Sequence, residues 1–204
     1  GALRRTVPKP GTLINASGRG FYGPRVEPSL TEQSPRGKGF LSDLCVGWEE
    51  AAKGAEDFGV RVVLPRIGMV LGNTGGALAK MVLPFRLFLG GPISPGTQQV
   101  SWIHQKDLSD LIVWLLSKPE ISGPVNAVAP ETVTMKEFCR TLGKALNRPS
   151  WFPVPEFVLK VAFGEMASVM TTGQDVKPLI AEQHGYKFSY PKLDLALQSL
   201  FKNN

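Results

Sequence analysis

The chain has 204 residues, 43% of them hydrophobic, and its 23 lysines and arginines against 17 aspartates and glutamates give a net charge of +6. This length suits one good-sized domain, and no stretch approaches the roughly 18 consecutive apolar residues of a membrane span. The basic residues are scattered and do not alternate with aromatic ones, which indicates a mildly basic solvated surface and argues against a nucleic-acid-binding protein.

The first eleven residues contain no signal-peptide core and predict the tail of a helix at residues 2–5, followed by a proline-rich loop. Such a beginning suggests that the sequence starts inside a larger fold. A short apolar run at residues 12–17 then predicts a buried strand.

Residues 18–23 match the pattern G-x-G-x-x-G, which in dinucleotide-binding proteins opens a helix whose N-terminus faces the pyrophosphate. Prolines follow at positions 24, 28 and 35, and no helical period begins before about Gly39. We therefore predict that these glycines do not bind phosphate.

A long helix is predicted over residues 40–58. Its expected buried face consists of Leu41, Leu44, Cys45, Trp48, Ala51, Ala52 and Ala55. A strand over residues 61–64, ended by Pro65, follows and completes the strand–helix–strand order of a parallel sheet. Residues 68–76 predict a glycine-rich loop, and residues 77–89 predict a helix that breaks at Pro84.

A strand over residues 100–103 is predicted to lead through His104 into a helix from about Lys106 to Ser117. The apolar positions of this helix are Leu108, Leu111, Ile112, Leu115 and Leu116. Asp107 and Asp110 lie in its first turn, where negative charge suits the helix dipole. We interpret these two residues, and Glu49 on the earlier helix, as capping and ion-pairing groups.

The rest of the chain predicts one strand and several helices. The strand covers residues 124–127, and a helix follows from Thr134 to Leu146, with Glu137 completing a capping box. A loop at residues 149–155, helical residues 156–170 and a last helix with Leu193, Leu197, Leu200 and Phe201 complete the prediction. His184, before Gly185, is expected to cap a helix C-terminus. With about three strands, either further strands come from elsewhere or the sheet is small.

The two cysteines, Cys45 and Cys139, both fall in apolar helical patterns and have no partner at metal-ligand spacing. They are expected to be buried free thiols in a reducing intracellular compartment, and no metal site is predicted.

Ordered segments along nearly the whole chain resemble the extended short-chain dehydrogenase/reductases of the NAD-dependent epimerase/dehydratase family. The segments are residues 15–17, 21–23, 48–49, 66–72, 75–80, 84–86, 90–92, 101–104 and 126–130. Residues 101–104 resemble the family's R-D-[YFW]-[IV]-H segment, with Val100-Ser101 in place of Arg-Asp. The similarity is greatest to the branch with the cell-division-inhibitor-like epimerases and the plant giant-chloroplast protein, whose own C-terminal extension residues 148–155 and 164–165 resemble.

This resemblance implies an α/β fold, with the C-terminal part of a Rossmann-type parallel sheet and a smaller helix-rich substrate-like domain. It implies a partial Rossmann-type domain over residues 1–130 and a helix-rich extension over residues 131–204. It also implies an NAD(P) cofactor. Family chains open with a G-x-x-G-x-x-G strand–loop–helix that holds the cofactor phosphates, and these 204 residues contain none. The phosphate-binding half of the site is therefore expected to be missing from the chain.

Family enzymes transfer a proton with a tyrosine whose pKa is lowered by a lysine four residues later. The matching positions here are Leu41 and Cys45, and neither can perform that step. The resemblance leaves Tyr22 and Ser17 as candidate catalytic residues, although Ser17 is equally well explained as a hydroxyl that ends a strand.

The resemblance also assigns residues to the two ligands. It implies cofactor contacts from Ala16, Ser17, Arg66, Gly68 and Val70, and substrate contacts from Arg86 and His104. For Arg66, packing or an ion pair is an equal alternative to binding an anionic ligand.

Three functions follow as hypotheses. The first is a catalytically degenerate NAD(P)-binding-fold protein with a regulatory or structural role, in a plastid complex or in organelle division. The second is an active NAD(P)-dependent oxidoreductase or epimerase on a small, sugar-nucleotide-like substrate. The third is an accessory subunit that needs protein partners in a larger complex. The resemblance to the plant branch implies a chloroplast location.

Overall fold

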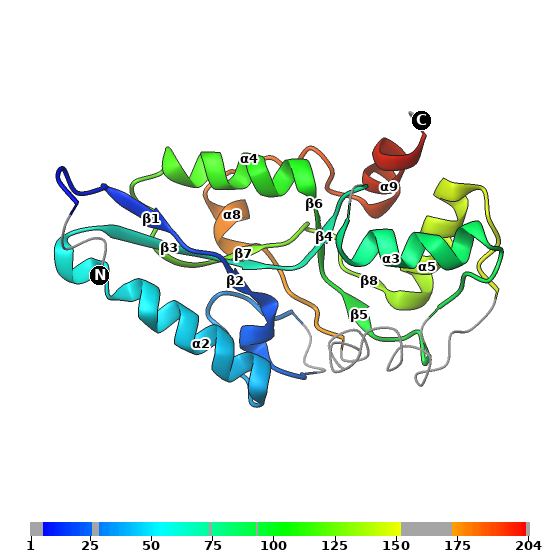
Figure 1. The fold of residues 1–204 in the computed structure, drawn as a ribbon, viewed down its shortest axis with the longest axis horizontal. Helices are drawn as coiled ribbons and strands as arrows, with labels where there is room; N and C mark the ends of the chain where they lie inside the picture. Colours follow the sequence, from blue (N-terminus) through cyan, green and yellow to red (C-terminus); the bar gives the residue numbers. More distant parts are fainter. Residues whose placement is uncertain (1–5, 26–28, 74, 93, 152–172, 203–204) are drawn as a thin grey trace.

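The computed structural model describes residues 6–25, 29–73, 75–92, 94–151 and 173–202. Its central sheet contains β1 (Thr12–Ile14), β2 (Ser17–Gly18), β3 (Arg61–Ile67) and β7 (Gly123–Ala127). β3 lies in the middle, pairing in parallel with β1 and β2 on one side and with β7 on the other. Figure 1 shows α2 (Phe40–Lys53) on one face of this sheet and α4 (Gln105–Leu116) on the other. The predicted α/β fold with a parallel sheet is confirmed.

Successive side chains of β3 point to opposite faces, which divides the core around the sheet into two layers. Val62 and Leu64 pack with Ala52 on the α2 side, whereas Val63 packs with Leu111 on the α4 side. Helix α8 (Leu179–Gln183) joins the α4 layer through Ala181. All five residues from 62 to 66 are buried, as expected for a parallel strand covered on both faces.

The prediction that Pro65 ends its strand is wrong, because β3 continues to Ile67. β1 pairs with β3 up to Val63, and β2 resumes the pairing at Arg66. Pro65 therefore lies opposite the break between β1 and β2, where the missing N–H of proline interrupts no ladder bond. The same break divides the strand predicted over residues 12–17 into two short strands.

Other predicted boundaries also need correction. The helix predicted to reach residue 58 ends at Lys53, and a separate 3-10 turn, η2 (Glu56–Phe58), follows it. The predicted loop at residues 68–76 contains strand β4 (Met69–Leu71), which pairs in parallel with β6 (Trp102–His104). Helix α3 (Gly76–Arg86) continues through Pro84 and ends two residues after it.

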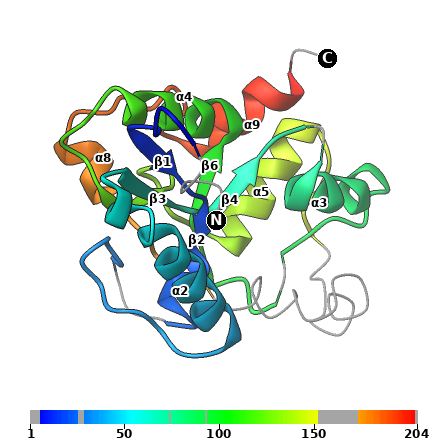
Figure 2. The same cartoon turned by 60° about the vertical axis from the view of Figure 1, so that its left-hand side comes forward.

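A second core lies beside the sheet, where α3, α5 (Met135–Leu146) and α9 (Leu193–Phe201) gather (Figure 2). Trp102, Phe138 and Leu197 are fully buried in it, and β5 (Gln99–Val100) pairs with β8 (Val133–Thr134) at its edge. The Thr134 cap predicted for α5 is confirmed, because Thr134 Oγ1 accepts a hydrogen bond from the Glu137 amide at 3.2 Å, whereas the Glu137 carboxylate pairs with Arg140. This core takes residues from both sides of position 130, and the domain division there stays a prediction.

Arg61, at the start of β3, fixes the end of helix α4. Its guanidinium donates hydrogen bonds to the carbonyls of Leu115, Leu116, Lys118 and Ile121, at distances of 2.7–3.3 Å. These carbonyls lie in the last turn of α4 and in the loop after it, so Arg61 ties the end of the helix to the start of β3. Leu115 is fully buried as predicted, but Leu116 is 53% exposed, which corrects its assignment to the buried face.

The helical predictions at residues 2–5 and 156–170 lie outside the described residues. Among the residues that are described, no helix is long and apolar enough to cross a membrane. Both cysteines are buried free thiols that form no disulfide, as predicted.

Candidate functional site

Several polar side chains gather where the parallel strands end. Tyr22 lies in a 3-10 turn, η1 (Arg19–Tyr22), directly after β2, and Arg66 and Asn126 lie near the ends of β3 and β7. In open α/β sheets ligands bind outside this carboxyl edge. Yet the side chains are covered: Arg66 is 3% exposed, and Tyr22 and Asn126 are 0% exposed.

Arg66 forms a bidentate ion pair with Glu49, a residue of α2 that is itself only 3% exposed. Nε and Nη2 of Arg66 donate to the two Glu49 carboxylate oxygens at 2.8 and 2.9 Å, and Ser17 Oγ donates to Oε1 at 2.8 Å. The Phe21 ring lies 3.3 Å from the guanidinium carbon. Burial alone would lower the pKa of Arg66, but its hydrogen bonds to Glu49 and Tyr22 outweigh burial and raise this pKa.

Tyr22 has both a donor and an acceptor bond within this cluster. Its hydroxyl donates to Asn126 Oδ1 at 2.6 Å and accepts from Arg66 Nη1 at 3.2 Å. Burial raises the pKa of Tyr22, and the nearby Arg66 charge and both hydrogen bonds only partly offset it. The side-chain nitrogen of Asn126, Nδ2, in turn donates to the Lys177 carbonyl at 2.9 Å. Both the oxygen and the nitrogen of the Asn126 side chain are therefore hydrogen-bonded.

The glycine pattern at residues 18–23 has a packing role in this structure. A Cβ atom at Gly20 would lie 3.3 Å from Leu41 Cβ and 3.4 Å from Cys45 Sγ, both on α2. The turn η1 has only four residues, and α2 begins at Phe40, as expected from the prolines between them. Leu41 and Cys45, at the family's tyrosine and lysine positions, therefore face a tightly packed turn, and burial raises the pKa of the Cys45 thiol.

The remaining residues assigned from the resemblance are spread between the central sheet and the second core beside it. Ala16 is exposed in the break between β1 and β2, and Val70 is half-buried in β4. Gly68 approaches β6 so closely that a Cβ would lie 2.8 Å from the Ser101 carbonyl oxygen. Arg86 is exposed at the end of α3, which packs with α5 away from α2. Their ligand contacts stay predictions.

The cofactor positions can be compared with the chemistry of NAD(P). Ala16, Gly68 and Val70 offer backbone and small apolar groups, which suit the uncharged nicotinamide carboxamide end. The cation among them, Arg66, is held by Glu49 and is not free to bind phosphate. By their chemistry, the described residues assigned to the cofactor therefore suit its nicotinamide end better than its phosphates.

His104 is placed between α4 and α9 and acts as a helix cap. Its Nδ1 accepts from the Lys106 amide at 3.1 Å, and Ser199 Oγ lies 3.3 Å from Nε2. Its ring packs against the Tyr190 ring at a tilt of 39°, with ring centroids 4.0 Å apart. The ring is only 4% exposed. Burial lowers the pKa of His104, and Asp107 only partly opposes this effect. Its role as a substrate residue stays a prediction.

The lowered pKa of His104 predicts a loss of stability in acid. The unfolded chain binds a proton near pH 6.5, whereas the folded chain resists it, so the contribution of neutral His104 is complete above about pH 6.5 and falls below it. We expect the free energy of unfolding to drop more steeply between pH 7.5 and 5 in the native protein than in His104→Asn, which keeps a cap acceptor but does not titrate. His184→Asn, at an exposed histidine, serves as the control. The free energy of unfolding is measured by urea titration at each pH. An equal fall with decreasing pH in all three proteins would contradict the prediction.

Of the two acidic residues near the start of α4, one follows the expectation of simple capping or ion pairing and the other does not. Asp110 pairs with Lys106 on the surface, as predicted. Asp107 does not: it is fully buried and accepts hydrogen bonds from the amides of Ser189 and Tyr190 at 2.7 and 2.9 Å. The partner amides lie more than eighty residues away in the chain, which is why spacing alone could not reveal this contact.

Asn126, Glu32 and Gln174 are buried polar residues that the sequence reasoning missed. Asn126 carried a usable signal, since an amide within a short, otherwise apolar strand needs buried partners. Glu32 and Gln174 lie outside regular helices and strands, and nothing in their local pattern distinguishes them from solvated residues.

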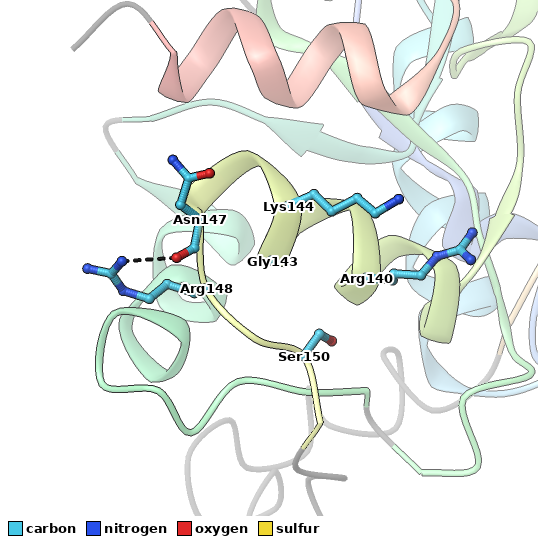
Figure 3. A pocket seen from close by; sticks show the side chains of 6 residues that line it. All are labelled: Arg140, Gly143, Lys144, Asn147, Arg148 and Ser150. Atoms are coloured by element: carbon cyan, nitrogen blue, oxygen red, sulfur yellow. Dashed lines mark hydrogen bonds between the residues drawn. The ribbon is translucent and has the colours of Figure 1, made fainter.

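A hollow of about 430 Å³ lies at the end of α5, away from the strand ends. Its lining residues are Arg140, Gly143, Lys144, Asn147, Arg148 and Ser150. Figure 3 shows the charged ends of Arg140 and Lys144 on one side of Ser150 and the Arg148 guanidinium on the other. Because these cations diverge, the hollow does not form a convergent anion site.

Comparison with known protein families places the chain among epimerase-like sequences. The model of a domain of unknown function, DUF1731, matches residues 154–200. The chain is 44% identical over 195 residues to the chloroplastic epimerase family protein SDR39U1 homolog of Arabidopsis thaliana, covering 95% of this chain and 56% of the relative. It is 40% identical over 201 residues to the epimerase family protein SDR39U1 of mouse, covering 98% of this chain and 68% of the relative.

A solved structure gives the same result. The human epimerase family protein SDR39U1 (isoform 2), crystallised with NADPH, matches with a TM-score of 0.93 and 38% identity, over 100% of this chain and 69% of the human one. The chain thus spans just over half the length of its Arabidopsis relative and about two thirds of the mammalian ones.

Proposed function

Because the chain belongs to the epimerase family of the SDR39U1 proteins, we propose that it is an epimerase-like protein that binds NAD(P) without the usual proton-transfer chemistry. Ala16, Gly68 and Val70 would meet the nicotinamide end, where a bound cofactor supplies hydride-transfer chemistry. The NADPH of the human relative supports this proposal.

The observation that carries the degenerate part of the proposal is the packing of Leu41 and Cys45. Leu41 has no proton to give, and the Cys45 thiol is buried with a raised pKa. Both residues pack against the turn η1, since a Cβ atom at Gly20 would lie 3.3 Å from Leu41 Cβ and 3.4 Å from Cys45 Sγ. A regulatory or structural role in a plastid fits such a protein, and the chloroplastic relative supports that location.

The test is a titration of the protein at its native length with NADPH and NADH, followed by nicotinamide fluorescence. We expect saturable binding, and at least a tenfold rise in Kd for Ala16→Trp, whose exposed position lets the variant fold. Val113→Trp, at a 66% exposed site on α4, should bind as the native protein does. No binding by the native protein, or equal binding by Ala16→Trp, would refute the cofactor site.

A second function is favoured by the contact between Arg66 and the Tyr22 hydroxyl. A fixed cation 3.2 Å from the phenol favours the phenolate, as the lysine does in family enzymes, and so opposes part of the rise in the Tyr22 pKa that burial causes. In this case Tyr22 would be the proton-transfer group of an active epimerase or oxidoreductase. Oxidation of NADPH in the presence of nucleotide sugars, or epimerisation of these sugars without net NADPH oxidation, would support the active enzyme if it is lost in Tyr22→Phe or Ser17→Ala. Absence of both reactions in the native protein would support the degenerate one.

A further inference from the structure

Tyr22 is completely buried because a loop covers it. We call residues 29–39 the cover loop. Its Leu30 packs with Tyr22 and with Val176, and its Gly37 amide donates to the Phe21 carbonyl at 2.9 Å. Without this loop, Tyr22 would lie at the edge of the sheet, where a ligand could reach it.

Within the cover loop, one carboxylate oxygen joins three parts of the fold. Glu32 is 9% exposed. Its Oε1 accepts hydrogen bonds from the backbone N–H of Asn126 in β7 at 2.8 Å and from the backbone N–H of Ile180 in α8 at 3.3 Å. The other oxygen, Oε2, is buried and has no hydrogen-bond partner. A charge on this carboxyl is therefore poorly compensated, whereas the neutral acid keeps both amide contacts.

The charged groups around Glu32 do not compensate a negative charge on its carboxylate. Arg66 on β3 faces it but is paired with Glu49, and Tyr22 on η1 is neutral. Asp175 and Lys177, on the segment paired with Leu30, form their own ion pair at 2.9 Å. β7 carries no titratable side chain, and Glu182 on α8 is exposed. Burial outweighs the amide bonds and the Arg66 charge, so the pKa of Glu32 is raised.

We propose that Glu32 is a pH-sensitive latch on the cover loop: the neutral acid holds the loop over Tyr22, and the ionised form releases it. Below the pKa of the open state Glu32 is neutral in both states, and closure is at its strongest. As the pH rises through the higher pKa of the closed state, the closed loop must carry a buried charge, and opening becomes easier. Each unit between the two pKa values changes the ratio of open to closed loop by about tenfold. This latch does not depend on whether Tyr22 takes part in turnover.

Limited digestion with trypsin tests the latch, because Arg36 and Lys38 lie exposed on the cover loop. Rates of cleavage after these residues are compared between the native protein and Glu32→Gln from pH 5 to 8.5. Glutamine keeps an acceptor for both amides but cannot ionise, and the pH response of trypsin itself cancels in the ratio. We expect the ratio of native to Glu32→Gln cleavage to rise several-fold as the pH increases.

Glu32→Ala provides the opposite reference, because it leaves both amides without an acceptor. We expect faster cleavage of this variant at every pH, with thermal unfolding still cooperative. A native to Glu32→Gln ratio that stays constant with pH would overturn the latch. So would a Glu32→Gln loop that is cut as fast as that of Glu32→Ala.

Discussion

Replacing Glu49 by Gln is expected to lower the free energy of unfolding by about 3–5 kcal/mol, because it leaves the buried guanidinium of Arg66 without a counter-charge. Water cannot solvate the charge that remains, since both side chains are only 4% exposed. The substitution also exchanges an acceptor of the Ser17 and Arg66 hydrogen bonds for an amide donor. Urea unfolding of the native protein and the variant measures the difference.

The neighbouring Glu50→Gln gives a matched control on the same helix. Glu50 is exposed, and its substitution should change stability by less than about 0.5 kcal/mol. A double variant, Glu49→Gln with Arg66→Met, should recover much of the loss, because no uncompensated charge remains buried. If Glu49→Gln were as mild as Glu50→Gln, the ion pair would not be the element that holds α2 to β3.

The buried face of α2 differs from the one that apolar spacing predicts for the helix over residues 40–58. Apolar spacing assigned Trp48 and Ala51 to the buried side, yet Trp48 is 50% exposed and Ala51 is exposed as well. Ser42 and Glu49 are buried in their place, because Ser42 Oγ donates to the Phe21 and Gly37 carbonyls and Glu49 binds Arg66. A polar residue can occupy a buried face only when distant partners satisfy it, and the helix sequence does not contain those partners.

Features that depend on neighbouring residues were predicted well. The Thr134 cap, the last helix at Leu193 and the strand at residues 124–127 all follow from local spacing, and the structure confirms them. The strand β3 was cut short at Pro65 because the sequence cannot show where its neighbours break. For the site, the resemblance located Tyr22 and Arg66 near one edge, but only the fold shows that Glu49, Asn126 and Glu32 surround them.

Asp107→Asn is expected to cost about 2–4 kcal/mol of unfolding free energy, the second largest effect of a single substitution. The two carboxylate oxygens accept one amide each, from Ser189 and Tyr190, and the side chain is fully buried. Asparagine keeps one acceptor and turns its amide toward the other N–H, so one buried donor loses its partner and a charge-assisted bond is lost. The Tyr186 hydroxyl also donates to the Asp107 backbone carbonyl, so Asp107 binds residues 186–190 through both its side chain and its main chain.

Asp110→Asn is the matched control, three residues further along the same helix. Asp110 pairs with Lys106 on the surface, where such a pair contributes less than about 1 kcal/mol. Hydrogen exchange should separate the two variants further: the Ser189 and Tyr190 amides should exchange much faster in Asp107→Asn and unchanged in Asp110→Asn. If both variants left these amides protected, Asp107 would not hold the segment before α9. Since α9 packs on α5 through Leu197, faster exchange at residues 189–190 should be accompanied by earlier thermal loss of that core than of the sheet around β3.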